Sequence, residues 1–342
     1  MKHVKNTGLI LLAIALCLPV KADVKKGKLV TNTGKGPVVS AVLPPLKGPK
    51  KFVAVQGFEN KVENPDTYWY RNPKLGSGMS DMLVTSLMDT GYFIVIEREQ
   101  LESVIAEQDL AASGRTTQAG HAKIGKINQA QTLIRGAVTL FEEGTKKKKG
   151  GIGGVLGNVA IGFGGGGSES QVGVDIRIFD TATSQILAAK TCKGYAKSKG
   201  KGLTLGIAGT SGGRPAGLAL GGSDFEKTPI GDATRQAINA AVNFIVTELN
   251  KIPWNGSVIK VTPEGKVYIN CGSRNGVNIG ETFSVFLKGE DLIDPDTGET
   301  LGSEETYTGD VQVVSTAEKY SICSKVSGGD IKKESIIRWK GV

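Results

Sequence analysis

The segment KKKKGGIGGVLGNVAIGFGGGGS, residues 146–168, decides how the fold of this chain is understood. Four lysines lead into it, and ten of the eighteen residues from Gly150 to Gly167 are glycine. This composition fits a linker, a phosphate-binding loop, or a strand built for surroundings other than water. The choice among the three determines both the architecture and the function that the sequence predicts.

A phosphate-binding loop is the least favoured of these interpretations. Gly151, Gly153 and Gly157 come close to a dinucleotide fingerprint, but that motif needs a strand before it and a helix after it. Here a lysine run precedes the glycines and further glycines follow them. We therefore expect no nucleotide at this segment, and we expect no cofactor elsewhere in the chain.

On both sides of the segment the sequence alternates between strand and helix patterns. The expected strands are 51–60, 92–98, 130–143 and two strands around a Thr-Ala-Thr-Ser turn within 172–192; the expected helices are 76–91, 99–114 and 232–252. Gly91 is placed to end the first helix, and Asp232 is placed to cap the last. The middle helix has its apolar residues on one side, at Leu101, Val104, Ile105 and Leu110. The alternation predicts an α/β domain over residues 51–253.

The N-terminal residues differ from this core. Residues 1–22 combine early lysines with the apolar run 9–18 and small residues at a cleavage site, which is typical of a secretory signal peptide. Cys17 is a candidate for lipid attachment, although Leu16 precedes it where a small residue is expected, so both possibilities stay open. Residues 23–50 are rich in Lys, Gly, Pro and Thr and predict an N-terminal arm.

The C-terminal residues 255–342 form short strand patterns joined by glycine-containing turns, with no convincing helix. They predict a small all-β domain. Within it DPDTGE (294–299) fits a hairpin turn better than a calcium loop. Cys271 and Cys323 either form a disulfide in this domain or remain two buried thiols.

No active site is recognisable in the sequence. GTSGG (209–213) matches a nucleophile elbow around Ser211, but Pro215 blocks the helix that should follow and His121 lies upstream. No group of residues has metal-ligand spacing. The net charge is +9, yet basic residues are not interleaved with aromatic ones and the chain is expected to be exported, so we expect no nucleic acid as partner. We expect a protein that is not an enzyme.

Two glycine-rich segments, about 144–171 and 194–228, interrupt the α/β core at equivalent places. Each contains apolar residues that alternate with small or polar ones, at Val159, Ile161 and Phe163 in the first and at Leu203, Leu205, Ile207, Leu218 and Leu220 in the second. Each arm can supply about ten residues, the length that a tilted strand needs to cross a bilayer. The alternation is typical of barrel strands. Two mobile loops are the alternative, and the symmetric placement favours membrane hairpins.

The core carries a family resemblance in MLVTSLMDTGYFIVIER (82–98) and VDIRIFDTATSQIL (174–187). These stretches, within a match over roughly 51–250, resemble the CsgG family, the curli secretion channel of the bacterial outer membrane. The resemblance implies a periplasmic α/β domain that assembles into a homo-oligomeric ring. Each subunit would give two β-hairpins to one shared transmembrane barrel in outer-membrane lipid, and the ring would export an unfolded protein substrate. Lys146 to Lys149 should then lie at the aqueous rim or face the lumen.

Two further expectations come from the resemblance. In the family, the connection at NPDTYWYRNP (64–73) forms the constriction of the pore, which makes Tyr68, Trp69, Tyr70 and Asn72 candidates for that role. The stretch VYINCGSRNGVNIGETFSVF (267–286) resembles the C-terminal domain of the flagellar assembly protein FlgT. A periplasmic scaffold or envelope-anchoring protein that never inserts into the membrane is the alternative function.

Overall fold

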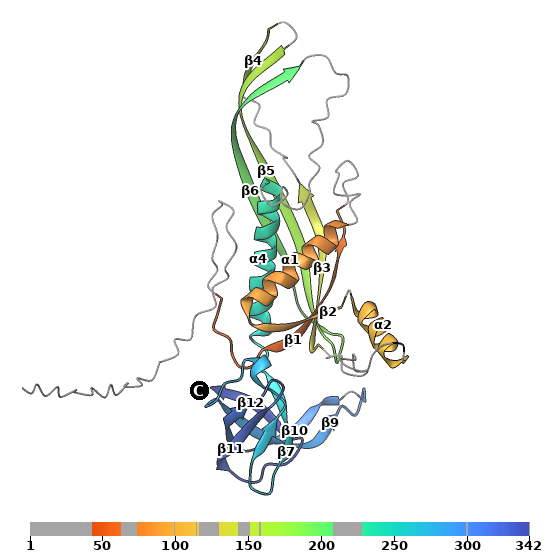
Figure 1. The fold of residues 1–342 in the computed structure, drawn as a ribbon, viewed down its shortest axis with the longest axis vertical. Helices are drawn as coiled ribbons and strands as arrows, with labels where there is room; N and C mark the ends of the chain where they lie inside the picture. Colours follow the sequence, from red (N-terminus) through yellow and green to blue (C-terminus); the bar gives the residue numbers. More distant parts are fainter. Residues whose placement is uncertain are drawn as a thin grey trace, which may run out of the picture.

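The computed structural model has an α/β body, a C-terminal barrel below it and a ribbon of strands that leaves the body at the opposite end (Figure 1). It describes residues 43–62, 74–98, 100–113, 115, 130–142, 151–156, 159–207, 228–298 and 300–341. The two parts have separate hydrophobic cores.

Six strands form one mixed sheet in the order β2–β1–β3–β5–β4, with β6 paired to β5. β1 pairs in parallel with β2 and β3, whereas the β3–β5, β4–β5 and β5–β6 pairs are antiparallel. Central strand β1 buries the consecutive residues Val53, Ala54 and Val55, which explains its unbroken apolar sequence. The strands are β1 (Lys51–Asn60), β2 (Phe93–Glu97), β3 (Thr132–Glu142), β4 (Gly151–Leu156), β5 (Val159–Asp180) and β6 (Ile186–Ile207).

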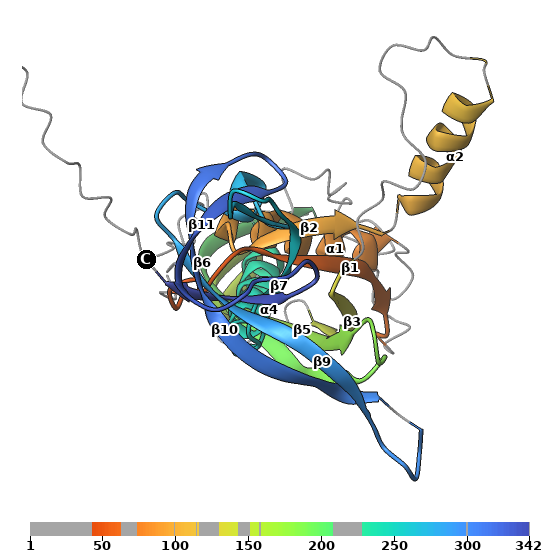
Figure 2. The same ribbon diagram turned by 90° about the horizontal axis from the view of Figure 1, so that it is seen from below.

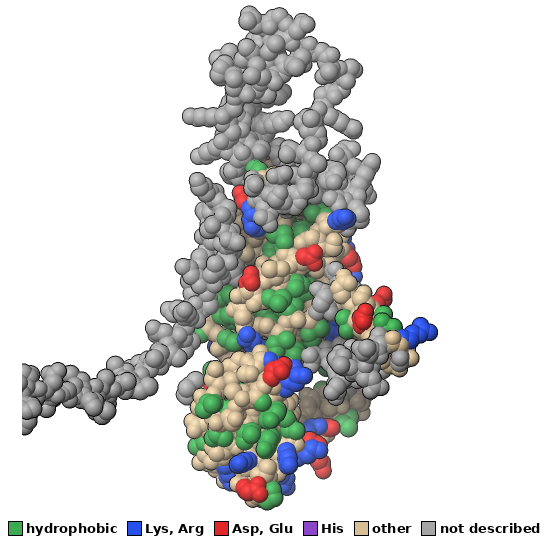
Figure 3. All heavy atoms as spheres, viewed as in Figure 1, with side chains coloured by type: hydrophobic (Ala, Val, Ile, Leu, Met, Phe, Trp, Pro, Cys, Tyr) green, Lys and Arg blue, Asp and Glu red, His purple; other side chains and the backbone are tan. Residues whose placement is uncertain are grey.

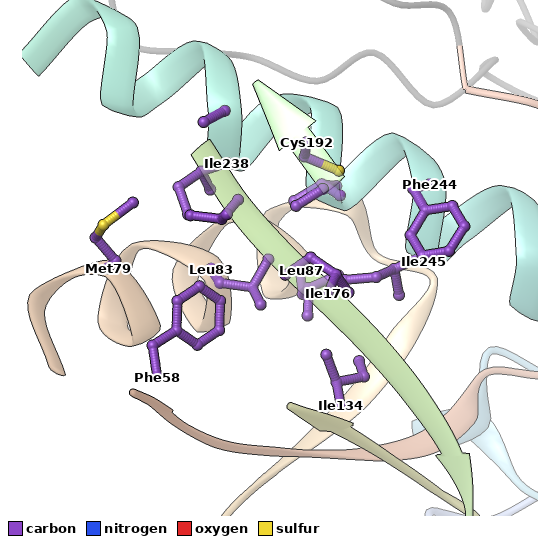
Figure 4. Packing of buried hydrophobic residues seen from close by; sticks show 14 of the residues in the cluster. Phe58, Met79, Leu83, Leu87, Ile134, Ile176, Cys192, Ile238, Phe244 and Ile245 are labelled. Atoms are coloured by element: carbon purple, nitrogen blue, oxygen red, sulfur yellow. The ribbon is translucent and has the colours of Figure 1, made fainter. Parts of the chain in front are cut away.

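Two of the described helices cover one face of this sheet (Figure 4). α1 places Leu83 and Leu87 against it, and α4 places Ile238 and Ile245. All four side chains are almost completely buried with Ile176 of β5, and each such burial is worth about 1.5–3 kcal/mol. The helices are α1 (Lys74–Thr90), α2 (Leu101–Ala112) and α4 (Pro229–Leu249).

The ends of the two packed helices show which cap predictions were correct. Gly91 adopts φ +72 and its N–H donates to the carbonyl of Met88 at 3.0 Å, so the predicted end of α1 is confirmed. The prediction that Asp232 caps α4 is wrong. Thr228 is the cap, because its hydroxyl accepts from the N–H of Gly231 at 3.1 Å and a proline follows it in the first helical position.

Helix α2 confirms the expected helix at 99–114 but buries none of its residues. Its apolar side chains Val104, Ile105 and Leu110 are exposed, and the helix stands away from the sheet (Figure 2). The described part of the chain therefore does not bury the apolar side that the sequence shows. None of the described helices is long and apolar enough to cross a membrane.

The C-terminal part is a closed barrel of six strands in the order β10–β11–β8–β7–β12–β9. Phe283, Val285, Val311 and Ile337 fill it, and Trp254 packs edge-on against Phe283 with ring centroids 5.9 Å apart. Closure removes the unpaired sheet edges. The strands are β7 (Asn255–Val261), β8 (Val267–Ile269), β9 (Thr282–Ile293), β10 (Thr300–Thr316), β11 (Ser321–Gly328) and β12 (Ile336–Gly341), with the short helix η2 (Ser273–Asn275) between β8 and β9.

Body and barrel are joined by polar contacts around Lys50. Its N–H donates to the carbonyl of Asn275 at 2.7 Å, and the amide of Asn275 donates back to the carbonyl of Lys50 at 3.3 Å. The guanidinium of Arg274 lies over the ring of Phe52 at 5.2 Å. Lys51 donates to the carbonyls at the end of α4, so β1, α4 and the barrel are linked at one place.

The structure confirms a mixed α/β fold with an all-β C-terminal part. Insertion of the glycine-rich segments into a shared transmembrane barrel stays a prediction.

The contact between α4 and the sheet depends on Gly194. A Cβ at this position would lie 1.9 Å from the carbonyl oxygen of Ala233 and 2.7 Å from the nitrogen of Ala237. We expect Gly194→Ala to lower the free energy of unfolding by about 1–3 kcal/mol, because α4 must move off the sheet. Gly78→Ala is the control, since a Cβ there meets open space. This substitution should raise the free energy of unfolding by about 0.5–1 kcal/mol. Urea titrations followed by circular dichroism measure both, and equal effects would contradict this packing.

Candidate functional site

The ribbon consists of the outer halves of two long strands and one short strand. β5 pairs with β3 only from Gln171 onward. Its pairing with β6, in contrast, runs from the core out to the pair Val159↔Ile207. β4 joins on the other side of β5 along Val159–Gly164. The ribbon is therefore a direct continuation of the core sheet (Figure 1).

The pairing also connects the two glycine-rich segments to each other. The first supplies β4 and the outer half of β5, and these form the expected hairpin. The second supplies the outer half of β6, which pairs with that hairpin along its whole length. Within one subunit the two segments thus form a three-stranded ribbon.

The register places the apolar residues of the ribbon on one face. Val159 is opposite Ile207, Ile161 is opposite Leu205, and Phe163 is opposite Leu203. Directly paired residues share a face, and so do residues two apart. All six of these predicted membrane-hairpin positions therefore lie on the same face. The positions between them hold small residues, in the pairs Ala160↔Gly206, Gly162↔Thr204 and Gly164↔Gly202.

Lysine positions border the apolar face on its core side. Lys201 is opposite Gly165, Lys199 is opposite Gly167, and Lys197 is opposite Glu169, all at the same parity as Leu203. A lysine that faces lipid costs about 2–4 kcal/mol at the midplane of a bilayer and close to nothing at its interfaces. Any contact with hydrocarbon must then begin beyond position 201. This border could have been predicted, because a period of two runs in the sequence from Tyr195 through three lysines to Leu203.

The two faces continue into different surroundings at the core. Val172, Val174, Ile176 and Ile178 continue the small-residue face and are fully buried beneath the helices. Asp175, Arg177 and Tyr195 continue the apolar face and lie on the side of the sheet that the helices do not cover. The buried core residues therefore fix which face of the ribbon is apolar.

The uncovered side of the sheet is polar, with its charges paired within the chain. Glu59 accepts from Arg135 and lies 3.1 Å from the ammonium of Lys61, and Thr191 donates to Asp175 at 2.6 Å. A pocket of about 100 Å³ lies here, lined among others by Glu59, Lys61, Arg135, Asp175 and Arg177. Arg177 is opposite Arg135 in the register. Among the described residues no group of carboxylates, histidines and cysteines could hold a metal ion.

The outer edges of the ribbon are open. Among the described strands β6 pairs only with β5, and β4 also pairs only with β5. An unpaired edge presents a row of backbone donors and acceptors to any strand that can align with it. The ribbon can therefore be extended on both sides by other strands.

Several predicted site residues lie outside the described residues. The candidate constriction residues Tyr68, Trp69, Tyr70 and Asn72 are among them, as are Leu218, Leu220 and the lysine run 146–149. Their roles stay predictions.

The three described cysteines are free and buried. Cys271 and Cys323 both lie in the core of the barrel. Burial raises the pKa of Cys323 to about 12 and raises the pKa of Cys271 as well. Burial also raises the pKa of Cys192 on β6. In the structure the thiols of Cys271 and Cys323 are both free. The disulfide between them stays a prediction.

Thiol counting tests burial and pairing together. The folded chain without its leader should react slowly with a thiol reagent at pH 8, because burial keeps all three groups protonated and covered. In denaturant without reductant, three thiols should react if Cys271 and Cys323 are free, and one if they are paired. Rapid labelling of the folded chain would contradict the burial of the three thiols. Three reactive thiols in the oxidised, exported protein after denaturation would contradict the disulfide.

A family model described as "Curli production assembly/transport component CsgG" matches residues 38–258, which is more than half of the chain. The match ends where the C-terminal barrel begins, so the resemblance of that barrel to FlgT stays a prediction. No curated protein matches the chain.

Solved structures with a similar fold come from several bacteria. The hypothetical protein CT253 from Chlamydia trachomatis is 12% identical, with 58% of this chain and 98% of that chain covered at a TM-score of 0.33. A PelC dodecamer from Paraburkholderia phytofirmans is 14% identical, with 58% and 92% covered at 0.28. Lipoprotein GNA1162 from Neisseria meningitidis is 14% identical, with 43% and 84% covered at 0.23. Likenesses this weak carry no argument about function.

Proposed function

Because the chain belongs to the CsgG family, we propose that it is a non-enzymatic subunit of a ring-forming outer-membrane channel that exports an unfolded protein. The observation that carries this proposal is the register of the ribbon, which gathers the alternating apolar residues of both glycine-rich segments on one face. The apolar face of the ribbon suits contact with lipid, and the opposite face of small residues suits the lumen of a barrel.

Closure of the barrel requires several copies of the chain. A ribbon alone in lipid would leave the outer edges of β4 and β6 unpaired, and each unsatisfied backbone group in hydrocarbon costs several kcal/mol. Once the predicted return strand completes the second hairpin on β6, pairing that hairpin of one subunit with the first hairpin of the next satisfies the remaining edges, and only a closed ring satisfies all of them. The proposal therefore makes oligomerisation a condition of insertion.

The lysine border sets the level of the membrane on the ribbon. Positions 197, 199 and 201 would stand at the periplasmic rim, next to the headgroups. A tilted strand needs about 9–11 residues to cross, so the crossing that begins at Leu203 has to continue past Ile207. The predicted return strand with Leu218 and Leu220 would complete the second hairpin.

The rest of the chain would then lie in the periplasm. The barrel is at the end of the molecule opposite the ribbon (Figure 1), so it points away from the membrane once the ribbon is inserted. The proposed signal peptide, residues 1–22, delivers the chain to this compartment. The region around Tyr68 and Trp69, between β1 and α1, would provide the constriction, as the family resemblance implies.

Two neighbouring positions of β6 test which face meets lipid. Leu205→Lys places a charge on the apolar face and should abolish conductance in planar bilayers, because each subunit adds one lysine to the lipid-facing wall. Thr204→Lys, one residue away on the other face, should leave insertion intact and change ion selectivity. Channels of equal frequency from both variants would contradict the proposed orientation.

A deletion separates the channel from the alternative scaffold function. The chain without residues 199–222 should fold and stay soluble but give no conductance, because the second hairpin is gone. Negative-stain images of detergent extracts of the full chain should show rings. Soluble monomers without rings would favour the non-inserting scaffold instead.

The constriction has its own test. Replacing Tyr68 and Trp69 together by Ala should raise single-channel conductance, since two bulky side chains per subunit leave the narrowest part of the pore, while assembly is unchanged. Unchanged conductance together with a lower melting temperature would identify them as anchors that pack on the core.

A further inference from the structure

The hairpin of β9 and β10 extends well beyond the barrel (Figures 1 and 2). Pairing continues out to Thr300↔Ile293, and the tip carries three exposed apolar side chains: Leu292, Ile293 and Leu301, with 54%, 61% and 67% of their surface exposed. Three such neighbours on a projecting tip are costly in water unless something covers them. We name residues 288–305 the acidic hairpin.

Its charge differs in sign from that of the chain. Residues 288–305 contain seven carboxylates and one lysine, whereas the whole chain carries +9. Lys288 pairs with Asp291 at 2.7 Å, and Arg338 pairs with Glu305 at 2.7 Å. Within the described residues, Glu290 and Asp296 have no ion pair and are exposed. The hairpin thus presents uncompensated negative charge beside its apolar tip.

The turn of the hairpin is held in one conformation. The carboxylate of Asp294 accepts from the N–H groups of Asp296 at 2.8 Å and Thr297 at 3.3 Å. The N–H of Gly298 donates to the Asp294 carbonyl at 2.8 Å, with Gly298 at φ +70. The hydrogen bonds from the backbone lower the pKa of Asp294, so it is ionised at neutral pH. A turn ordered in advance loses little entropy when it binds.

A second surface of the barrel lies over β8 and the start of β11. Tyr268 and Tyr320 lie side by side with ring centroids 6.0 Å apart, and Ile322 is opposite Tyr268 in the register. Tyr320 is 41% exposed. We name this surface, made by Tyr268, Tyr320 and Ile322, the tyrosine face. Hydrophobic side chains are exposed on the barrel, with Lys and Arg near them, in Figure 3.

Lysines surround the tyrosine face. Lys260 is opposite Tyr268 on β7, and Lys266 and Lys319 are exposed at its border. Glu264 and Glu318 stand there too, so charge alone makes the face only weakly basic. Its attraction for the acidic hairpin therefore combines lysines with aromatic surface, the residue type most enriched at protein interfaces.

We propose that the acidic hairpin of one subunit docks on the tyrosine face of the next, joining the C-terminal barrels head to tail. Tyr268 lies on β8, across the closed barrel from β9 and β10, and Tyr320 and Ile322 lie at the start of β11, between β8 and β10 in the strand order. Two different complementary surfaces at separate places on one chain make a heterologous contact, and such contacts close into a ring when the rotation per subunit allows it. The inference rests on the ring of the proposed function and gives the barrel a role in it.

Cross-linking tests the direction of the contact. Ile293→Cys and Tyr320→Cys are introduced together in the chain without residues 1–22 and treated with a short bis-maleimide; the three described native cysteines are buried and contribute little. The double variant should give a ladder of cross-linked oligomers on denaturing gels. Each single variant should stay monomeric, because in a head-to-tail contact position 293 never meets a second position 293. Dimers from a single variant, or no ladder from the double variant, would overturn the inference.

Charge reversal provides a second test in the same cysteine background. Glu290→Lys with Asp296→Lys should lower the ladder yield about fivefold, since attraction becomes repulsion. Adding Lys260→Glu with Lys319→Glu should restore it. Glu107→Lys with Asp109→Lys, two exposed carboxylates on α2 of the body, is the matched control and should change nothing. Loss without restoration would show that the hairpin does not meet this face.

The inference and the proposed function fail in different ways. Rings and conductance without a ladder would overturn the barrel contact and leave the channel standing. A ladder without conductance or insertion would retain the contact and favour the scaffold. A ladder that appears only with another protein attached would assign the acidic hairpin to a different partner.

Discussion

The two longest strands, β5 and β6, pair with each other from the core to the tip of the ribbon, and this pairing satisfies the backbone donors and acceptors on the edges that face each other. The inner half of this pair is the part of the sheet on which α4 packs. The outer half carries the apolar face that the channel proposal needs. Because both halves belong to the same two strands, the body and the ribbon cannot be positioned independently.

The core also fixes the orientation of the ribbon. A slip of one residue would move Val174 and Ile176 out of the core and bring Asp175 and Arg177 beneath α4. That exchange would expose buried apolar surface and bury charges without partners, at a cost of several kcal/mol. A folded core therefore determines which face of the ribbon Leu203, Leu205 and Ile207 occupy, even though glycine-rich strands specify their own register weakly.

Much of this could be predicted from the sequence. The apolar run of β1, the period of α1 and the Gly91 stop signal were sufficient for the α/β part, and strand patterns with glycine turns were sufficient for the barrel. Asp232 was mistaken for the cap of α4 because the Thr-Pro pair before it was overlooked. The apolar side of α2 predicts burial, but periodicity shows only that one side of a helix is apolar and not what covers it.

The pairing of the two glycine-rich segments could not be predicted, because register depends on contacts between residues far apart in the chain. The same holds for the acidic hairpin and the tyrosine face, whose separate positions around the barrel follow from strand order. Charge and aromatic content were visible in the sequence, but their places around the barrel were not.

The most direct test of the account is to measure the polarity around each position of β6. Single cysteines from 203 to 207 in the full-length chain, labelled with an environment-sensitive dye and reconstituted in vesicles, report lipid or water at each site. The account predicts blue-shifted emission, quenched by lipid-borne quenchers, at 203, 205 and 207, and quenching by aqueous iodide at 204 and 206. Uniform exposure to water at all five positions would contradict it.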